Sequence, residues 1–256
     1  MIANYHTHTP RCRHANGAEE EYIQTAINSG LKILGFSDHT PYWFPGEYYS
    51  HMRMYPDELH EYCSCIRLLQ RKYAGKLQIH LGLEIEYYPA YFQELMSRLR
   101  DQGIEYCLLA QHWLGSEIGE PYCGHPTEDE SRLRRYCDQV IEAMNTGIFT
   151  YLAHPDLIHF VGENQIYQKH MRRLCREANA CGIPLEINLL GLTNGRNYPD
   201  HRFWQVAGEE NCCCIIGCDA HSPDAIANLP AQLQAAELVQ KYGLTLLETV
   251  ELRPIG

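Results

Sequence analysis

Histidines and carboxylates recur in this sequence at positions where they could bind metal ions. The first apolar run leads into His6 and His8, and two imidazoles at i and i+2 point to the same face of a β-strand. His14 follows in a loop that contains proline and glycine. A His-x-His pair alone is weak evidence for a metal site, because such pairs also occur by chance in half-buried strands. The pair therefore needs support from the rest of the chain.

Further side chains of the metal-binding kind follow the later apolar runs. These runs end in Ser37-Asp38-His39, Leu83-Glu84-Ile85-Glu86, Gln111-His112-Trp113, Ala153-His154-Pro155-Asp156, Glu186-Ile187-Asn188 and Cys218-Asp219-Ala220-His221. In barrels of parallel βα units the C-terminal ends of the strands lie on one face, so these side chains would meet. Histidines without a common role would be scattered over helices and both ends of the strands. The joint pattern predicts a His/carboxylate metal centre, which suits Zn²⁺, Mn²⁺ or Fe²⁺.

Strand and helix signals alternate along the chain and predict an α/β protein. The expected strands are Ile2–His6, Lys32–Ser37, Leu77–Glu84, Tyr106–Ala110, Phe149–Ala153, Pro184–Asn188 and Cys213–Cys218. The expected helices are Ala18–Ser29, Pro56–Tyr73, Ala90–Gln102, Glu128–Thr146, Gln165–Ala180, Pro199–Glu209 and Pro223–Tyr242. Glycines that favour a left-handed C-cap follow six of the helical stretches: Gly30, Gly75, Gly103, Gly147, Gly182 and Gly243. Seven βα units favour a barrel over an open sheet, and the run Leu244–Glu251 could add an edge strand.

Length and charge narrow the class of protein. A chain of 256 residues is long enough for one large α/β barrel, and no linker or repeat divides it. No apolar run approaches the ~20 residues that span a bilayer. No secretory signal is visible at the N-terminus, so we expect a cytoplasmic enzyme without a membrane partner. The net charge of −11 argues against nucleic acid as a partner, although bound divalent cations could still attract an anionic substrate.

The twelve cysteines do not have the spacing of a disulfide framework. Cys212, Cys213 and Cys214 lie in an apolar run, where a free cysteine behaves as a small hydrophobic residue. A pair of CxxC knuckles is absent from the sequence, which argues against a structural zinc site. We therefore expect reduced, structural cysteines.

In their order and spacing, these motifs resemble those of the PHP (polymerase and histidinol phosphatase) superfamily. The matching motifs are His6-Thr7-His8, Ser37-Asp38-His39-Thr40, Gly82-Leu83-Glu84-Ile85-Glu86-Tyr87, Gln111-His112-Trp113, Ala153-His154-Pro155-Asp156 and Cys218-Asp219-Ala220-His221-Ser222. The resemblance covers almost the whole chain. It implies a distorted (β/α)7 TIM-like barrel, formed by residues 1–256 as a single domain, with three divalent metal ions (Zn, Mn or Fe) at the C-terminal ends of the strands.

The resemblance also implies ligands for each ion. The first ion would be bound by His6, His8, Glu84 and Asp219. The second would share Glu84 as a bridge and add His112 and His154. The third would be bound by His14, His39 and His221. All nine positions carry suitable residue types in this sequence.

Within the superfamily, the histidinol-phosphatase branch looks most similar. The helix expected in Met54–Tyr73 leads into the strand Leu77–Glu84 as in that branch, and Leu185–Asn188 precede a Gly-Leu pair. In that branch a basic residue usually follows the Gly-Leu pair almost at once. Here Thr193-Asn194-Gly195 come before Arg196, the candidate for contact with phosphate.

The predicted function is hydrolysis of a small phosphate monoester by a metal-activated hydroxide. Two ions bridged by Glu84, ~3.5–4 Å apart, would lower the pKa of a shared water, and Arg196 would help to neutralise the phosphate oxygens. The expected catalytic residues are therefore Glu84, Asp219 and Arg196. The favoured reaction converts L-histidinol phosphate to L-histidinol and phosphate in histidine biosynthesis. The alternatives are a phosphodiesterase or nuclease of the same superfamily and a non-catalytic metal-binding protein.

The residues expected to bind the substrate are Arg196, Asn188 and Trp43. Trp43 belongs to an aromatic segment, residues 42–49, which either closes over the site as a lid or packs on a neighbouring helix. Asp38 either orients the His39 ring or caps the following turn. Glu47, Glu86 and Glu120 are expected in loops near the mouth of the site. The oligomeric state is left open.

Overall fold

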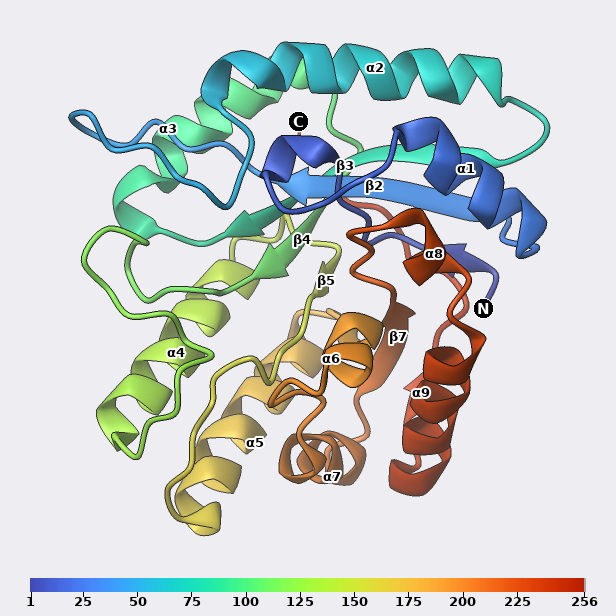
Figure 1. Cartoon of the computed structure of the whole chain (residues 1–256). Helices are drawn as coiled ribbons and strands as arrows, with labels where there is room; N and C mark the ends of the chain where they lie inside the picture. The colour runs from blue at the N-terminus through green and yellow to red at the C-terminus, as the bar shows by residue number, and fades with distance from the viewer. Residues whose placement is uncertain (256) are drawn as a thin grey trace.

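Residues 1–255 of the computed structural model form a parallel β-sheet that is covered by helices (Figure 1). The strands are β1 (Ala3–Asn4), β2 (Ile33–His39), β3 (Gln78–Glu86), β4 (Tyr106–Ala110), β5 (Tyr151–Leu152), β6 (Leu185–Asn188), β7 (Cys213–Gly217) and β8 (Thr245–Leu246). They lie side by side in chain order, and every neighbouring pair is parallel. The eighth strand comes from the run Leu244–Glu251, which was predicted as an edge strand.

The sheet curls so that β1 and β7 approach each other at their C-terminal ends. Beyond these strands, Thr7 forms a parallel bridge with Ala220. The N–H of His8 donates to the carbonyl of Ala220 over 2.9 Å, and the N–H of Ala220 donates to the carbonyl of His6 over 3.1 Å. The predicted distorted TIM-like fold is thus confirmed, as a strongly curled sheet in which β8 extends β7 on the outside.

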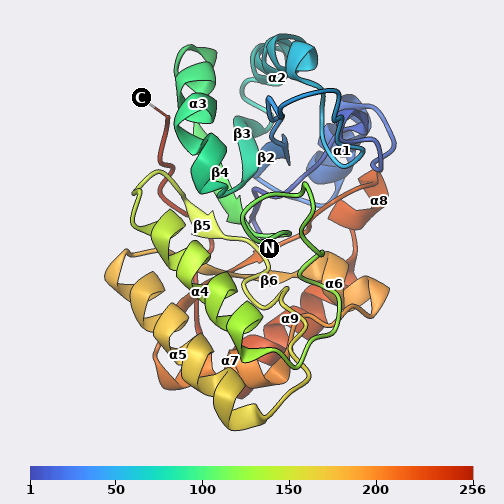
Figure 2. The ribbon, with the colours of Figure 1, turned by 90° about the vertical axis from the view of Figure 1, so that its left-hand side faces the viewer.

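Helices form the outer layer around the strands (Figure 2). The α-helices are α1 (Glu19–Asn28), α2 (Leu59–Lys72), α3 (Pro89–Leu99), α4 (Glu130–Met144), α5 (Asn164–Ala180), α6 (Leu189–Asn194), α7 (His201–Glu209), α8 (Pro223–Ile226) and α9 (Leu229–Tyr242), and the 3₁₀ helices are η1 (Pro10–Cys12), η2 (Pro56–Glu58) and η3 (Arg100–Gln102). All six glycines predicted to end helices have φ between +59° and +82°. Within residues 1–255, no helix is long and apolar enough to cross a membrane.

Two helical predictions differ from the structure, and asparagine caps explain both. The helix expected at Pro223–Tyr242 is divided into α8 and α9, because Asn228 Oδ1 accepts a hydrogen bond from the N–H of Ala231 and starts a new helix. The short helix α6 was not predicted. It begins directly after β6, where Asn188 Oδ1 accepts from the N–H of Gly191 over 3.0 Å.

The interior of the curled sheet has its own small apolar cluster, separate from the large core under the helices. Along β4, Tyr106, Leu108 and Ala110 belong to the inner cluster, whereas the alternating residues pack in the helical core. The Tyr106 hydroxyl donates to the carbonyl of Tyr5 over 2.6 Å. A Cβ atom on Gly82 of β3 would lie only 2.3 Å from the Tyr106 ring. The inner cluster is therefore tightly filled beneath the C-terminal ends of the strands.

Replacing Gly82 by alanine should destabilise the fold through this contact. We expect Gly82→Ala to lower the free energy of unfolding by about 1–3 kcal/mol, the usual cost of overpacking, as measured by urea denaturation. The same substitution in a Tyr106→Leu background should cost clearly less, because the clashing ring is gone. Equal costs in the two backgrounds would contradict this account of the inner cluster.

Candidate metal centre

The nine predicted metal ligands gather at the C-terminal ends of the strands. Each of the seven histidine rings in the set has another of the seven within 5.2 Å, measured between ring centroids. His8 and His221, more than two hundred residues apart in sequence, are stacked with centroids 4.1 Å apart. Most of the set is buried, but His14 is exposed and His221 is half-buried. The strand ends therefore bring together the side chains that the sequence singled out.

Glu84 lies at the middle of this cluster. Its carboxylate oxygens are 3.3 Å from His6 Nε2 and 3.0 Å from His154 Nε2. They are also 3.7 Å from His8 Nε2 and 2.8 Å from His39 Nδ1. The contact with His39 follows from strand register, because His39 of β2 and Glu84 of β3 are paired neighbours in the parallel sheet. A carboxylate in this position could bridge two ions.

Several sets of ligand atoms are close enough to share an ion. One set is His14, His39 and His221, and another is His6, His8 and Asp219; within each set the ligand atoms lie within 4.8 Å of one another. Glu84 forms further sets with His6 and His154 and with His8 and His39. The ring of His112 lies beside that of His154, with centroids 4.9 Å apart. The first two sets each fall within one ion of the division that the resemblance implies, whereas the two sets that contain Glu84 combine ligands assigned to different ions.

Many of these ligand atoms are buried without a hydrogen-bond partner in residues 1–255. These atoms include His6 Nε2, His8 Nε2 and His221 Nε2, while His39 Nδ1 and Glu84 Oε2 face each other over 2.8 Å without the geometry of a hydrogen bond. Each unsatisfied buried polar group costs about 1–3 kcal/mol, so a convergent set of them indicates a common binding partner. Imidazole nitrogens and carboxylate oxygens are ligands that Zn²⁺, Mn²⁺ and Fe²⁺ accept. The residues present therefore fit divalent cations.

Buried acceptors orient the rings of the histidines from behind. His6 Nδ1 lies 2.8 Å from Glu186 Oε1, and His112 Nδ1 lies 2.8 Å from Glu86 Oε1. His14 Nδ1 faces the carbonyl of Cys12 over 2.7 Å. Because carboxylates and carbonyls accept hydrogen bonds, Nδ1 of each ring carries the proton and Nε2 keeps its lone pair for a metal.

Glu86 and Glu186 were not recognised as supporting residues from the sequence. Glu86 was expected in a loop near the mouth of the site, but it is completely buried at the end of β3, so that prediction was wrong. The signal that could have found it is strand periodicity, since Glu84 and Glu86 are spaced i and i+2 and share a face.

Asp38 supports the centre differently from the prediction. Its Oδ1 accepts from the backbone N–H of His39 over 2.8 Å and its Oδ2 from that of Thr9 over 3.2 Å. Oδ1 also lies 3.5 Å from His8 Nδ1. Of the two alternatives for Asp38, orientation of the His39 ring is therefore wrong, and the contact with the following backbone N–H fits the cap. Asp38 holds the backbone of two ligand-bearing segments and faces His8 instead.

Two candidate ligands have strained backbones. His154 has φ +28° and Asp219 has φ +49°, a region that residues other than glycine rarely adopt. Such conformations cost of order 1–3 kcal/mol each and persist only where the surroundings enforce them. Here the N–H of His154 donates to Glu186 Oε2 over 3.1 Å, and Asp219 Oδ2 accepts from Asn188 Nδ2 over 3.1 Å. The strain turns both side chains toward the centre.

The clustered charges shift the pKa of several groups. Burial lowers the pKa of His6, but Glu186, Asp219 and Glu84 outweigh burial and raise it well above its usual value. Burial raises the pKa of Glu84, but His39 and His6 outweigh it and hold the pKa well below the usual range. Burial lowers the pKa of His39 to about 4. Without a cation, protons on part of the histidine set thus balance the buried carboxylates.

A cavity of about 210 Å³ opens onto the cluster. Its lining combines candidate ligands with Met52, Tyr122, Leu190, Asn194, Arg196 and Tyr198. Arg196 Nη1 donates to the Tyr198 hydroxyl over 3.1 Å, so the guanidinium is held at the wall of the cavity. Of the three residues predicted to bind the substrate, Arg196 is the one that lines this cavity.

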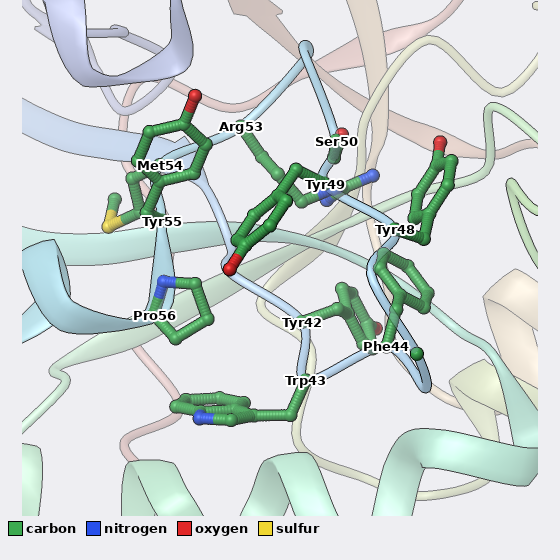
Figure 3. Close-up of a pocket in the computed structure, with 11 residues that line it drawn as sticks. Tyr42, Trp43, Phe44, Tyr48, Tyr49, Ser50, Arg53, Met54, Tyr55 and Pro56 are labelled. Carbon is green, nitrogen blue, oxygen red and sulfur yellow. The ribbon is translucent and has the colours of Figure 1, made fainter.

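The other two predicted substrate residues do not line this cavity. Asn188 is buried, and its amide is engaged by Asp219, Glu186 and the N–H of Gly191. The structure places it as a support for Asp219. Trp43 lines a separate cavity of about 200 Å³ within the aromatic segment (Figure 3) and packs against Arg98 of α3.

The aromatic segment of residues 42–49 packs against the start of α3. The ring centroid of Tyr42 lies 5.0 Å from that of Tyr88, and the ring centroid of Phe44 lies 5.4 Å from that of Tyr91. These contacts agree with the interpretation that the segment packs on a neighbouring helix. Further along the same loop, Met52 lines the cavity over the cluster.

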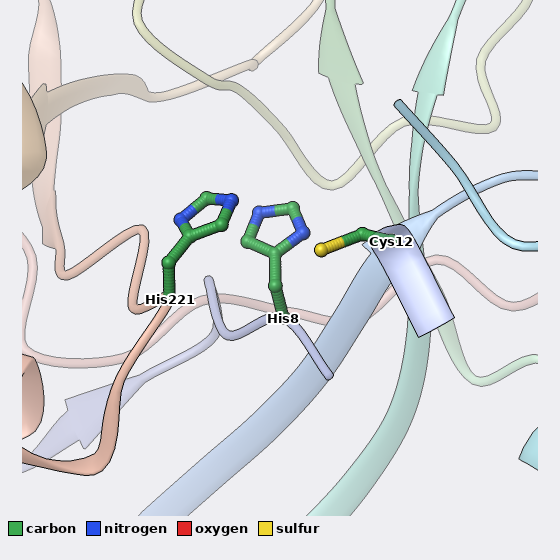
Figure 4. A group of neighbouring side chains, drawn as sticks. All are labelled: His8, Cys12 and His221. Carbon is green, nitrogen blue, oxygen red and sulfur yellow. The ribbon is translucent and has the colours of Figure 1, made fainter. Parts of the chain in front are cut away.

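One cysteine lies next to the centre. Cys12 is completely buried, and its sulfur lies within 4.8 Å of nitrogen atoms of His8 and His221 (Figure 4). Burial, with a smaller contribution from Asp38, raises the pKa of the Cys12 thiol, so it stays protonated at neutral pH in the metal-free protein. All twelve cysteines are free and nine of them are buried, which agrees with the expectation of reduced, structural cysteines.

Comparison with known proteins identifies the family. The model of the PHP domain matches residues 4–189. A protein of Deinococcus radiodurans named "Probable histidinol-phosphatase" is 29% identical over 234 residues, which are 88% of each chain. A protein of the same name from Schizosaccharomyces pombe is 25% identical and covers 100% of this chain and 92% of its own. This chain belongs to the PHP domain family.

A solved structure agrees with this assignment at the level of the fold. The crystal structure of histidinol phosphate phosphatase from Lactococcus lactis, complexed with zinc, L-histidinol and phosphate, has a TM-score of 0.73 at 20% identity and covers 98% of this chain and 97% of that one. This likeness supports the fold, whereas the sequence relatives support the predicted histidinol-phosphatase-like branch and the predicted class of enzyme, a phosphoric monoester hydrolase.

Protonation of His8 should make the stability of the metal-free protein fall with rising pH. Burial lowers the pKa of His8, but Asp219, Asp38 and Glu84 raise it overall from 6.5 to about 9. Because the pKa of His8 is higher in the folded than in the unfolded protein, protonation of His8 contributes fully to the stability of the fold below pH 6.5. This contribution disappears as the pH rises toward 9. We expect the melting temperature of the metal-free protein to fall over this range.

A bound divalent cation should remove most of this decline, because it replaces the proton as the partner of the carboxylates. A His60→Gln variant, changed on the exposed face of α2, should keep the decline and serves as the control. Parallel declines in the metal-free and metal-loaded proteins would contradict the proposed charge balance.

Proposed function

We propose that this chain is a metal-dependent phosphomonoesterase whose preferred substrate is L-histidinol phosphate. The observation that carries the proposal is the convergence of unpaired buried imidazole and carboxylate atoms at the floor of a cavity that also contains an arginine. The names of the two sequence relatives, and the L-histidinol and phosphate bound to the Lactococcus lactis protein, support this substrate. The products would be L-histidinol and inorganic phosphate.

The proposed metal ligands are divided over three divalent ions. His6, His8, Glu84 and Asp219 would bind one ion, Glu84, His112 and His154 a second, and His14, His39 and His221 a third. When bound, such ions supply Lewis acidity that activates water and stabilises charge on phosphate. The seven histidines provide neutral nitrogen ligands, and Glu84 and Asp219 return only two negative charges. The loaded pocket would thus favour a dianionic phosphate on a protein of net charge −11.

Arg196 is the proposed phosphate contact from the protein itself. It lines the same cavity as the candidate ligands, and its hydrogen bond to the Tyr198 hydroxyl leaves further N–H groups of the guanidinium available to oxygens of the substrate. The leaving alcohol would lie toward Met52 and Tyr122, which form another part of the cavity wall.

The proposed phosphoesterase unit extends over the whole chain. The family model ends at residue 189, but Asp219 and His221 lie beyond it and belong to the sets of candidate ligands. The segment that carries them follows β7 and is hydrogen-bonded to the backbone of His6 and His8. The centre would be incomplete without this C-terminal part.

Removal of metal should abolish phosphatase activity, and Mn²⁺ or Zn²⁺ should restore it. We expect the restored protein to hydrolyse histidinol phosphate with a higher kcat/KM than p-nitrophenyl phosphate or sugar phosphates, as measured by phosphate release. Glu84→Gln should lose activity by at least about 10²-fold together with bound metal, whereas Glu237→Gln, on the exposed side of α9, should retain both. Preference for another ester would contradict the substrate, and preference for oligonucleotides would favour a nuclease.

Arg196 should contribute to binding of the phosphate group. Loss of a charged hydrogen bond worth about 1.5–3 kcal/mol predicts that Arg196→Met lowers kcat/KM by roughly 10–150-fold, with metal content unchanged. Arg172→Met is the matched control, because Arg172 on α5 pairs with Glu209 and Glu210 away from the cavity. Unchanged steady-state kinetics in Arg196→Met would exclude this residue as the phosphate contact.

A further inference from the structure

We infer that Arg53 is a positioning residue, which joins the two loops at the mouth of the cavity and holds Glu86 where it orients the His112 ring. The inference rests on the proposed role of His112 as a metal ligand. Arg53 lies in the loop of residues 40–55 between β2 and η2, far from the strand ends in sequence. Neither Arg53 nor its partner Glu117 was among the residues predicted to act at the site.

Arg53 is buried, with 2% of its surface exposed, and all five N–H donors of its guanidinium have acceptors. Nη1 donates to the carbonyl of Thr40 and to Glu86 Oε2, each over 2.9 Å. Nη2 donates to Glu86 Oε1 over 3.1 Å and to Glu117 Oε2 over 2.5 Å. Nε donates to Glu117 Oε2 over 3.1 Å. The guanidinium is therefore fixed in position by two carboxylates and a carbonyl.

These contacts connect three parts of the molecule. Arg53 belongs to the loop that also carries Tyr48, Tyr49 and Met54 (Figure 3). Glu86 ends β3, and Glu117 lies in the loop of residues 111–129 between β4 and α4. Met52 from the first loop and Tyr122 from the second both line the cavity over the candidate metal centre. Arg53 thus fixes the relative position of two walls of that cavity.

The connection continues to His112 through a shared oxygen. Glu86 Oε1 accepts hydrogen bonds from Arg53 Nη2 and from His112 Nδ1, the latter over 2.8 Å. His112 itself belongs to the second loop, and the Tyr122 ring of the same loop is stacked on it at an interplanar angle of 13°. If Arg53 were lost, Glu86 would keep His112 but lose two charged donors. The carboxylate could then rotate, and the His112 ring with it.

The support of His6 differs in origin. Its partner Glu186 is held by the Tyr151 hydroxyl, the backbone N–H of His154 and the amide of Asn188, which belong to or directly follow β5 and β6. The support of His112 depends instead on a loop residue. A buried ion pair adds little stability over a well-packed apolar core, so stability alone does not explain three buried charged groups at this place. The contacts of these three charged groups link the two loops to His112, and this link gives a reason for their burial.

The test compares Arg53→Met and Arg53→Lys with the unchanged protein. Nitrogen-15 NMR of the metal-free, histidine-labelled protein should show the Nδ1–H tautomer of His112 in the unchanged protein and a mixture of tautomers in Arg53→Met. Chelator competition with Zn²⁺, followed by elemental analysis, should show a 10–100-fold loss of affinity for one ion, the usual effect of removing a supporting residue. KM should rise as well, because Met52 and Tyr122 line the cavity. Arg53→Lys, which keeps the charge but cannot reproduce the five bonds, should be intermediate.

Two further variants separate an effect on the position of the His112 ring from a general loss of stability. Leu174→Ala truncates the core under α5 and should lower stability without altering the His112 tautomer or ion affinity. Glu117→Gln serves as a second test variant if Arg53→Met does not fold, because Arg53 is hydrogen-bonded to both Glu117 and Glu86 and so connects them. It should cause a smaller loss of affinity in the same direction.

A parallel His112→Ala variant separates this inference from the proposed function. If His112→Ala loses an ion while Arg53→Met and Glu117→Gln keep unchanged affinity and tautomer, the positioning role of Arg53 is overturned and the ligand set stands. If His112→Ala binds as many ions as the unchanged protein, the proposed ligand set fails. In that case the NMR result for Arg53→Met decides the positioning role. An unaltered tautomer of His112 overturns the role, and an altered tautomer supports it.

Discussion

The burial of the Glu84 carboxylate among four imidazoles is the constraint on which the rest of the site depends. Only 1% of Glu84 is exposed, and its ion-pairing partners within residues 1–255 are all histidines. A buried carboxylate needs compensating positive charge nearby. Histidine can meet this need in two ways, by binding a proton or by binding a metal ion. The same geometry therefore serves a protonated metal-free state and a metal-loaded state, and pH decides how easily one replaces the other.

The fold satisfies this constraint through the register and curl of a parallel sheet. Register places His39 beside Glu84, and the bridge between Thr7 and Ala220 brings the segments that carry His8 and Asp219 together. The left-handed backbone at Asp219 then turns its carboxylate toward the cluster. Each of these features is local, but none works without the others, because the ligands come from both ends of the chain.

Much of this arrangement could be predicted from the sequence, for a physical reason. Parallel strands end on one face, so residue types at the strand ends identify the ligands without knowledge of side-chain packing. What could not be predicted depends on long-range packing. The pairing of Arg53 with Glu117, for example, joins two loops through residues that are 64 positions apart in the sequence. Likewise, Asn188 has a side chain suited to bind substrate, but the start of α6 and Asp219 engage its amide.

Glu186 and Glu86, the carboxylates that orient His6 and His112, are themselves held in place by different parts of the structure. Glu186 is held by residues of the strands, so the orientation of the His6 ring depends on the sheet and not on a loop. Glu86 is held by an arginine from a loop, so the orientation of His112 depends on where that loop and its neighbour lie. Loops open locally at lower free energy than core strands do. An ion bound by His112 and His154 would consequently exchange more readily than one bound by His6 and His8, and substrate contacts with Met52 or Tyr122 would influence its retention. In this chain, metal binding would then be coupled to the position of the two loops that form the cavity wall.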